Sequence, residues 1–219
     1  MLEYQKQFID LAIAHQALRF GEFTLKSGRI SPYFFNAGQF QTGSALAILG
    51  NCYAQAIINA NLDIDILFGP AYKGIPLATA TAIALANHHQ KNLPYCFNRK
   101  ESKKHGEGGV LVGAPLEGNV LIVDDVITAG TAVTEAIEII VSAGATPSAV
   151  LIGLNRLEPG YAKLSATEEV EQRFNVPVIS VIDLNDIVDY LTNSGTETEL
   201  ASILAYQEQY GINRKETHQ

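Results

Sequence analysis

The segment 120–132, VLIVDDVITAGTA, constrains the fold of this chain more than any other stretch. Four consecutive large apolar residues at 120–123 are typical of a strand that is buried on both faces inside a parallel sheet. Asp124 and Asp125 follow, and then a turn of small residues. A helical pattern begins at residue 132, where Thr131 suits the N-cap, and Gly144 suits the helix end. We therefore predict a strand, a short turn and a helix N-terminus, with two carboxylates just before the turn.

This arrangement favours a binding site for a ribose phosphate. Free backbone N–H groups and the positive end of the helix dipole bind phosphate, and small residues at 129–131 allow close approach. Ionised Asp124 and Asp125 accept hydrogen bonds only, so they match a ribose diol. The alternative is a capped helix after a buried strand with a solvated acidic edge; the adjacent small-residue turn argues against it. The segment carries neither the P-loop motif nor the dinucleotide motif.

Two cations follow other predicted strands. An apolar strand at 64–68 leads into a compact loop with Lys73, before a helix from residue 75 to about 86. A strand at 148–154 ends near Arg156. Ligands of open parallel sheets bind at the carboxyl ends of the strands. Lys73 therefore suits a diphosphate, although a lone loop lysine is usually solvated. The planar guanidinium of Arg156 suits a carboxylate or a pair of carbonyl oxygens.

The N-terminal region predicts a small hood beside the main sheet. Residues 2–19 have a helical pattern, and 23–25 and 31–36 are expected to pair as a hairpin. Phe34 and Phe35 point to opposite faces of such a strand. One is expected to anchor the hood and the other to lie against a flat ligand; the alternative is that both are ordinary buried aromatics.

A basic segment at 99–109, RKESKKHGEGG, stands out in an acidic chain. Four of the fifteen Lys and Arg residues fall within its first seven positions, and three glycines follow. Glycine favours backbone mobility. We interpret the segment as a lid that closes over a polyanion. The alternative is a solvated surface loop.

Length and composition narrow the class of protein. The chain has 219 residues, 47% of them hydrophobic, which fits one domain with a sizeable core. Its formal charge of −8 argues against nucleic acid or an anionic membrane as the main partner. Cys52 and Cys96 are interpreted as buried hydrophobes, not as a disulfide or metal site. With no signal-peptide pattern and no apolar run of membrane-spanning length, a soluble cytoplasmic protein is expected.

Taken together, the strands near residues 64, 95, 120, 149 and 178, mostly alternating with helices, predict a doubly wound α/β fold with a mostly parallel sheet flanked by helices. From the first helix to about residue 213 the chain resembles the orotate phosphoribosyltransferases, which are type I phosphoribosyltransferases. The resemblance is carried by 24–29 (TLKSGR), 31–38 (SPYFFNAG), 69–76 (GPAYKGIP), 99–101 (RKE) and the segment 120–132. It implies one domain over 1–219, with residues 1–40 contributing the hood, as a helix plus β-hairpin, and 99–109 a mobile basic loop.

The resemblance also implies an activity. A phosphoribosyl group would pass from 5-phospho-α-D-ribose 1-diphosphate to orotate, giving orotidine 5′-phosphate and diphosphate in de novo pyrimidine synthesis. Mg²⁺ would be the cofactor, held mainly through substrate oxygens and water and not by a dedicated set of protein ligands. The protein would be a homodimer in which the basic loop also serves the neighbouring subunit.

Site residues carry over from the matched motifs. The expected catalytic residues are Lys103, His105 and Asp125. The expected contacts to phosphoribosyl diphosphate are Lys26, Tyr72, Lys73, Arg99, Lys100, Lys103, His105, Asp124, Asp125, Val126, Ile127, Thr128, Ala129, Gly130, Thr131 and Ala132. The expected contacts to orotate are Phe34, Phe35, Thr128 and Arg156.

Two other functions are weighed against this one. A phosphoribosyltransferase acting on a purine would keep the segment 120–132 but not the pair Phe34 and Phe35 together with Arg156. A non-catalytic regulator of the same fold would sense the sugar diphosphate and bind nucleic acid. Such a regulator would be expected to carry an additional basic module, and the sequence shows none.

Overall fold

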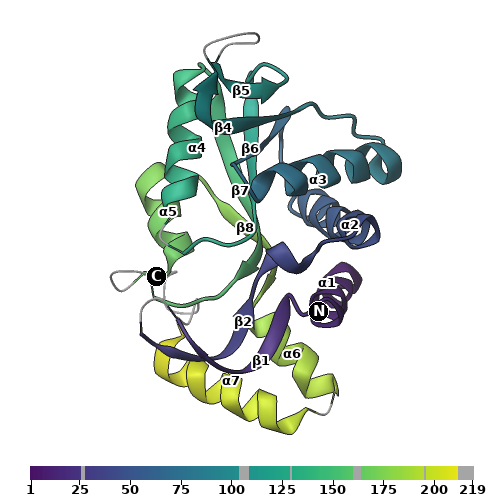
Figure 1. The fold of residues 1–219 in the computed structure, drawn as a ribbon, viewed down its shortest axis with the longest axis vertical. Helices are drawn as coiled ribbons and strands as arrows, with labels where there is room; N and C mark the ends of the chain where they lie inside the picture. Colours follow the sequence, from purple (N-terminus) through teal and green to yellow (C-terminus); the bar gives the residue numbers. More distant parts are fainter. Residues whose placement is uncertain (26–27, 104–108, 129, 160–163, 195, 212–219) are drawn as a thin grey trace.

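A six-stranded sheet forms the centre of the molecule (Figure 1). The computed structural model describes residues 1–25, 28–103, 109–128, 130–159, 164–194 and 196–211, with only the backbone at 102, 103 and 109. The strands lie in the order β5-β4-β3-β6-β7-β8, and all pairs are parallel except β4 with β5. Their bounds are β3 Ile66–Gly69, β4 Tyr95–Lys103, β5 Gly109–Gly113, β6 Asn119–Asp124, β7 Thr146–Asn155 and β8 Val178–Asp183.

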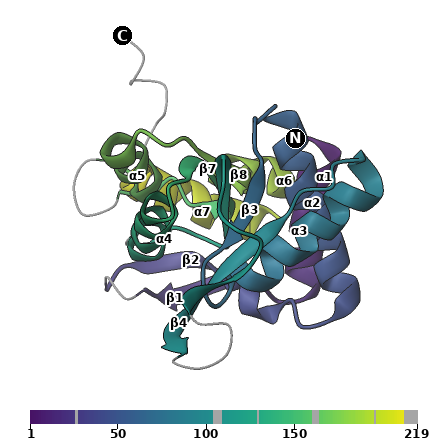
Figure 2. The same cartoon turned by 90° about the horizontal axis from the view of Figure 1, so that it is seen from above.

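Helices cover both faces of this sheet, as Figure 2 shows. Helices α2 (Gly43–Asn59) and α3 (Gly74–His89) cover one face, and α4 (Thr131–Ser142) and α5 (Ala166–Phe174) cover the other. The central strand β6 joins the two cores, because Leu121 and Val123 pack in one and Val120 and Ile122 in the other, all at 0% exposure. The predicted doubly wound sheet and its doubly buried central strand are confirmed.

The hood is built from both ends of the chain. Helix α1 (Glu3–Ala14) leads into an antiparallel hairpin of β1 (Leu18–Thr24) and β2 (Ile30–Phe35), and a short 3-10 helix follows at Ala37–Gln39. The hairpin lies below the sheet in Figure 1, next to α7 (Glu197–Tyr210), which follows α6 (Leu184–Ser194). The predicted helix and hairpin are therefore present, with α7 packed against β2 as an additional support.

The first helix is shorter than predicted. It ends at Ala14 and not near residue 19, and the chain reverses at Gln16, which has a positive φ of 57°. Leu18 then pairs with Phe35 in the hairpin and is only 2% exposed. Strand pairing and burial of Leu18 thus override the local helical pattern.

The basic segment 99–109 also differs from the predicted loop. Strand β4 extends as far as Lys103, and β5 begins at Gly109, with Lys103 and Gly109 paired across the hairpin. The first five residues of the segment are therefore strand. Residues 104–108 lie outside the described residues, so its mobility stays a prediction.

The connections of the two central strands place the site. Strand β3 continues through α3 to β4 on one side, whereas β6 continues through α4 to β7 on the other. Because α3 and α4 cover opposite faces, the chain diverges at the carboxyl ends of β3 and β6. Such a topological switch point is where open α/β sheets bind ligands.

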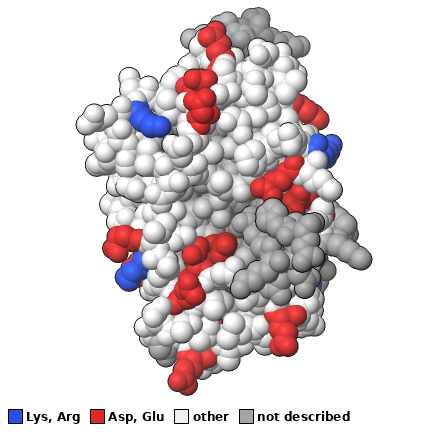
Figure 3. Space-filling view, turned by 180° about the vertical axis from the view of Figure 1, so that it is seen from behind, with Lys and Arg blue, Asp and Glu red and all other residues white. Residues whose placement is uncertain are grey.

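The sequence also predicts an acidic surface, buried cysteines and no membrane-spanning segment. On the face shown in Figure 3, Asp and Glu side chains outnumber Lys and Arg. Cys52 and Cys96 are both free and buried, and burial raises the pKa of the Cys52 thiol to about 12, so both behave as core residues. Within the described ranges, no helix combines the length and apolarity needed to cross a bilayer.

Candidate active site

The switch point brings Lys73 and Asp125 into contact. The Nζ atom of Lys73 donates a hydrogen bond to Oδ2 of Asp125 over 2.6 Å. Lys73 comes from the loop after β3 and Asp125 from the end of β6, which are neighbouring strands. The lysine side chain is 54% exposed, whereas that of Asp125 is 8% exposed. An exposed lysine side chain therefore contacts a buried carboxylate at the strand end.

Close backbone packing holds the Lys73 loop against β6. A Cβ atom at Gly74 would lie 2.7 Å from the main-chain oxygen of Val123, well inside normal contact distance. Only glycine permits this approach between the start of α3 and the end of β6. The sequence Lys73-Gly74 thus places the lysine at the carboxyl end of β6.

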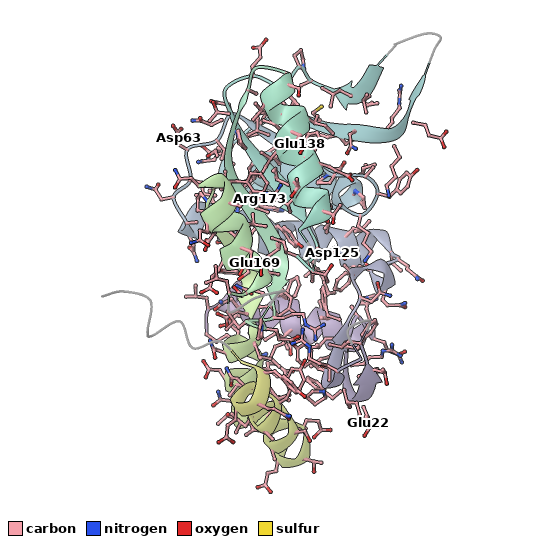
Figure 4. The ribbon with its side chains drawn as sticks, turned by 90° about the vertical axis from the view of Figure 1, so that its left-hand side faces the viewer. Glu22, Asp63, Asp125, Glu138, Glu169 and Arg173 are labelled. Atoms are coloured by element: carbon pink, nitrogen blue, oxygen red, sulfur yellow. The ribbon has the colours of Figure 1, made fainter. Side chains whose placement is uncertain are left out.

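Hydrogen bonds from two core elements hold the main chain of the two aspartates. The Tyr53 hydroxyl, from α2, donates to the main-chain oxygen of Asp124 over 2.9 Å, and the Gly153 N–H, from β7, donates to that of Asp125 over 2.8 Å. The side chains are ordered by short-range bonds, because Asp124 Oδ1 accepts from the Asp125 N–H and Asp125 Oδ1 from the Val126 N–H, each over 2.9 Å. Figure 4 shows Asp125 between α4 and the hairpin.

Burial changes the acidity of this pair. Counted over the whole residue, Asp124 is 7% and Asp125 6% exposed. Desolvation, followed by the neighbouring Asp125 charge, raises the pKa of the Asp124 carboxyl from 3.8 to about 7, although an N–H bond from Asp125 and the Lys73 charge act against the rise. A ligand that donates hydrogen bonds to the ionised carboxylate would lower this pKa again.

The turn into α4 leaves its first N–H groups open to a ligand. Gly130 and not Thr131 is the N-cap; it has a φ of 69°, and no side chain caps the helix. The left-handed conformation is one that glycine adopts without steric cost, which is why the predicted Thr131 cap is wrong. Thr128, Thr131 and Ala132 are exposed. The first N–H groups of a helix have no partner within it, so this end suits an anion.

The turn residues differ in what they can offer a ligand. Ile127 is 7% exposed and packs in the core beneath α4. Its side chain is therefore committed to the core, and only its main chain can face a ligand. Val126 is half-buried. Ala129 lies outside the described residues.

Strand β4 brings a second lysine to the Lys73 loop. Tyr72 is 68% exposed, and Nζ of Lys100 lies 5.3 Å from the centre of its ring. Asn98, also on β4, accepts a hydrogen bond from the Ala71 N–H over 2.9 Å. Arg99 is half-buried on the same strand. The described part of the site therefore gathers Lys73, Lys100 and Tyr72 near one strand end.

Several predicted residues fall outside the described atoms. Lys26 and His105 belong to segments that are not described, and only the backbone of Lys103 is placed, at the end of β4. Their predicted roles are therefore not tested by the geometry.

Arg156 lies at the end of β7 and is held by Glu158. Its Nε and Nη2 atoms donate to Oε1 of Glu158 over 2.9 and 2.7 Å, and its guanidinium carbon lies 4.9 Å from the centre of the Tyr33 ring. The Arg156 side chain is 17% exposed. The sequence correctly predicts an arginine at this strand end, and the hood residues in contact with it are Tyr33 and Ser31.

Phe34 and Phe35 have opposite environments, as the alternation of a strand requires. Phe35 is 9% exposed and stacks on Phe8, with ring centres 6.1 Å apart, so it anchors the hood in the core. Its ring is not available to a ligand, and only its main chain can take part in binding. Phe34 is half-buried and packs on Phe23 and Arg19 of the same hairpin.

The sequence did not indicate Tyr53, Tyr33 or Glu158 as residues of the site. Glu158 carried no usable signal, because Leu157, between it and Arg156, has a positive φ of 51° and the segment lies beyond the end of β7. Tyr53 carried none, since a tyrosine inside an apolar helix looks like any core residue. Among the described residues, no group of three or more His, Cys, Asp or Glu side chains is arranged to hold a metal ion.

Comparison with known proteins identifies the family. Residues 36–178 match the model of the phosphoribosyl transferase domain. Proteins named orotate phosphoribosyltransferase from Saccharophagus degradans and Cellvibrio japonicus are 63% and 65% identical, over 97% of this chain and 100% and 99% of theirs. The crystal structure of orotate phosphoribosyltransferase from Francisella tularensis is 45% identical, with a TM-score of 0.85 over 94% of this chain and 99% of that one.

The fold, the site and these matches agree. The chain belongs to the phosphoribosyltransferase family. Within that family it falls among the orotate phosphoribosyltransferases, which it matches over nearly its full length.

Proposed function

We propose that this protein transfers the 5-phosphoribosyl group of 5-phospho-α-D-ribose 1-diphosphate to orotate, giving orotidine 5′-phosphate and diphosphate in pyrimidine synthesis. The observation that carries the proposal is the contact of Lys73 with Asp125 beside the uncapped start of α4. One sheet edge thus carries a lysine suited to bind diphosphate, two carboxylates suited to accept the ribose hydroxyls, and a turn suited to bind phosphate. The full-length match to named orotate phosphoribosyltransferases supports the choice of substrates.

The sugar phosphate is bound by the end of β6 and the start of α4. Asp124 and Asp125 accept hydrogen bonds from the two ribose hydroxyls. The main chain of the turn and the first helical N–H groups hold the 5-phosphate, with the hydroxyls of exposed threonines as additional donors. The turn residues concerned are Val126, Ile127, Thr128, Ala129, Gly130, Thr131 and Ala132.

The chemistry requires positioning and leaving-group stabilisation. As diphosphate leaves the anomeric carbon, the sugar gains oxocarbenium character and negative charge builds on the leaving oxygen, so no protein nucleophile is needed. Preorganised cations around the diphosphate lower this barrier. Lys73 exchanges its Asp125 contact for the diphosphate when substrate enters. The other groups assigned to the diphosphate are Lys26, Tyr72, Arg99, Lys100, Lys103 and His105.

Mg²⁺ is the proposed cofactor, and the donor set fits it. The acidic oxygens of Asp124 and Asp125 are hard ligands of the kind that Mg²⁺ prefers. They are nearly buried, and Asp125 is engaged by Lys73, so these carboxylates would hold the hydrated ion through water while substrate oxygens complete its coordination. When bound, the ion neutralises charge on the diphosphate.

Orotate is assigned to the end of β7 and the hood. Arg156 offers its guanidinium to the carboxylate or a carbonyl oxygen of the base. Phe34 provides a ring surface for the base. Phe35 contributes only through its main chain, and Thr128 is the fourth residue assigned to orotate.

We further propose a cytoplasmic homodimer in which the basic segment 99–109 reaches the partner's site. The test mixes two inactive variants, Lys103→Ala and Asp125→Asn, after denaturation and refolding together. If the loop acts in the partner's site, each mixed dimer contains one intact site, and random pairing restores about a quarter of the activity. Recovery of no activity by the mixture contradicts loop sharing.

The activity itself is tested directly. Orotate, 5-phospho-α-D-ribose 1-diphosphate and Mg²⁺ are incubated with the protein, and the loss of orotate absorbance is followed. Consumption of orotate with release of diphosphate is expected, and omission of Mg²⁺ is expected to abolish it. Turnover of adenine, guanine or hypoxanthine in place of orotate would refute the assignment.

A further inference from the structure

A buried acidic side chain lies behind Arg156. The Oε1 atom of Glu158 accepts hydrogen bonds from Arg156 Nε, Arg156 Nη2 and the Tyr33 hydroxyl, over 2.9, 2.7 and 3.0 Å. Its Oε2 atom faces Nη1 of Arg29 at 4.0 Å. The Glu158 side chain is 9% exposed, so these groups and not water balance its charge. The proposed reaction gives Glu158 no contact with substrate.

The contact uses one particular edge of the Arg156 guanidinium. Nε and one N–H of Nη2 form the side edge, and both are directed at Glu158. Nη2 also approaches the Ser31 hydroxyl at 3.4 Å, and within the described ranges Nη1 has no hydrogen-bond partner. The Tyr33 ring covers one face of the guanidinium. The end of the fork, which carries Nη1, is therefore the part that remains for a ligand.

We propose that Glu158 is a positioning residue, which fixes the side edge of Arg156 so that the Nη1 end meets acceptor oxygens of orotate. This inference rests on the proposed function, in which Arg156 binds the base. An arginine has several rotatable bonds, and holding it in place before binding removes an entropic cost that the ligand would otherwise meet.

The hood and the last helix keep Glu158 in place. Tyr33 belongs to β2, and the ring of Tyr206 from α7 lies edge-on to it with centres 6.3 Å apart. The Tyr206 hydroxyl is buried, and desolvation, followed by the nearby Glu158 charge, raises its pKa. Glu158 thus connects the arginine at the sheet edge to two elements that are distant in sequence.

The test compares Glu158→Gln with Glu138→Gln, which makes the same charge change on an exposed surface of α4. Steady-state kinetics give KM for each substrate. Loss of charge-assisted bonds to Arg156 is expected to raise KM for orotate by about tenfold or more, with KM for the sugar diphosphate changed by less than about twofold. Glu138→Gln is expected to change neither. Glu158→Asp, which keeps the charge but withdraws it by one methylene, is expected to raise KM for orotate less than Glu158→Gln.

A double-substitution comparison separates positioning from general support. In an Arg156→Ala background, Glu158→Gln is expected to change KM for orotate by less than about twofold, because no guanidinium remains to be placed. Thermal unfolding of each variant identifies loss of folding; if Glu158→Gln does not fold, the Glu158→Asp comparison decides. Equal rises in KM for both substrates overturn the inference.

The outcomes also separate this inference from the proposed function. If Arg156→Ala raises KM for orotate and the Glu158 variants do not, the positioning role is wrong and the proposed function stands. If Arg156→Ala leaves KM for orotate unchanged, the assignment of Arg156 to the base fails, and the inference fails with it.

Discussion

Binding of a ribose diol at the Asp pair is expected to release a proton near neutral pH. In the free site the pKa of Asp124 is raised to about 7 by burial and by Asp125. Ribose hydroxyls that donate to the ionised carboxylate would return its pKa toward the ordinary value of about 4. At pH 6 a group of pKa 7 is about nine-tenths protonated, so about 0.9 proton is released per site; at pH 8 the release falls to about 0.1.

Isothermal titration calorimetry measures this release. The sugar diphosphate is titrated into the protein, without orotate, in buffers of different ionisation enthalpy at pH 6, 7 and 8. Asp124→Asn is the matched control, because the ligand's own 5-phosphate titrates near pH 6 and contributes equally in both proteins. The difference between wild type and Asp124→Asn is therefore the quantity predicted.

The same shift fixes the sign of a stability effect. The folded-state pKa of Asp124 lies above its unfolded value, so its contribution to stability is fully present below pH 4 and is lost as the pH rises toward 7. Asp124→Asn is expected to flatten the fall in unfolding free energy between pH 5 and pH 8, measured by urea denaturation. A proton release that is equal in wild type and Asp124→Asn at pH 6 would refute the reasoning.

Three further predictions test other parts of the site. A Cβ atom at Gly153 would lie 2.7 Å from the Tyr53 hydroxyl, so Gly153→Ala is expected to destabilise the protein by about 1–3 kcal/mol, and by less in a Tyr53→Phe background; simple additivity in urea denaturation would exclude this clash. Lys103→Ala is expected to lower kcat far more than it weakens substrate binding, because the cation acts on the developing diphosphate charge; equal effects on both contradict the lid role. Arg156→Ala is expected to weaken orotate binding and leave the affinity for the sugar diphosphate nearly intact, which equilibrium titration with each substrate can check.

Much of the fold follows from local patterns in the sequence. The run of apolar residues at 120–123 predicts the central strand because burial on both faces leaves no polar position. The strand, tight loop and helix around Lys73 repeat the same pattern, and chain order alone places both loops at carboxyl strand ends. The contact of Lys73 with Asp125 then follows from the pairing of β3 with β6.

Other features depend on contacts that no local pattern encodes. The end of the first helix is decided by the pairing of Leu18 with Phe35, and the length of β4 by its hairpin with β5. The N-cap residue of α4 has a left-handed backbone, which favours glycine. Gly130 is therefore the N-cap, and Thr131 is the first helical residue. Tyr53 and Glu158 act through partners 71 and 125 residues away in sequence, so composition and spacing do not reveal them.

The packing of α7 against the hairpin has a consequence for biosynthesis of the chain. Every group assigned to the sugar phosphate precedes residue 133, whereas Tyr206 lies much later in the chain. A nascent chain thus completes β7, whose Gly153 holds Asp125, before it contains the outer wall of the base pocket. The base pocket is therefore expected to be the last part of the site to close as the chain is made.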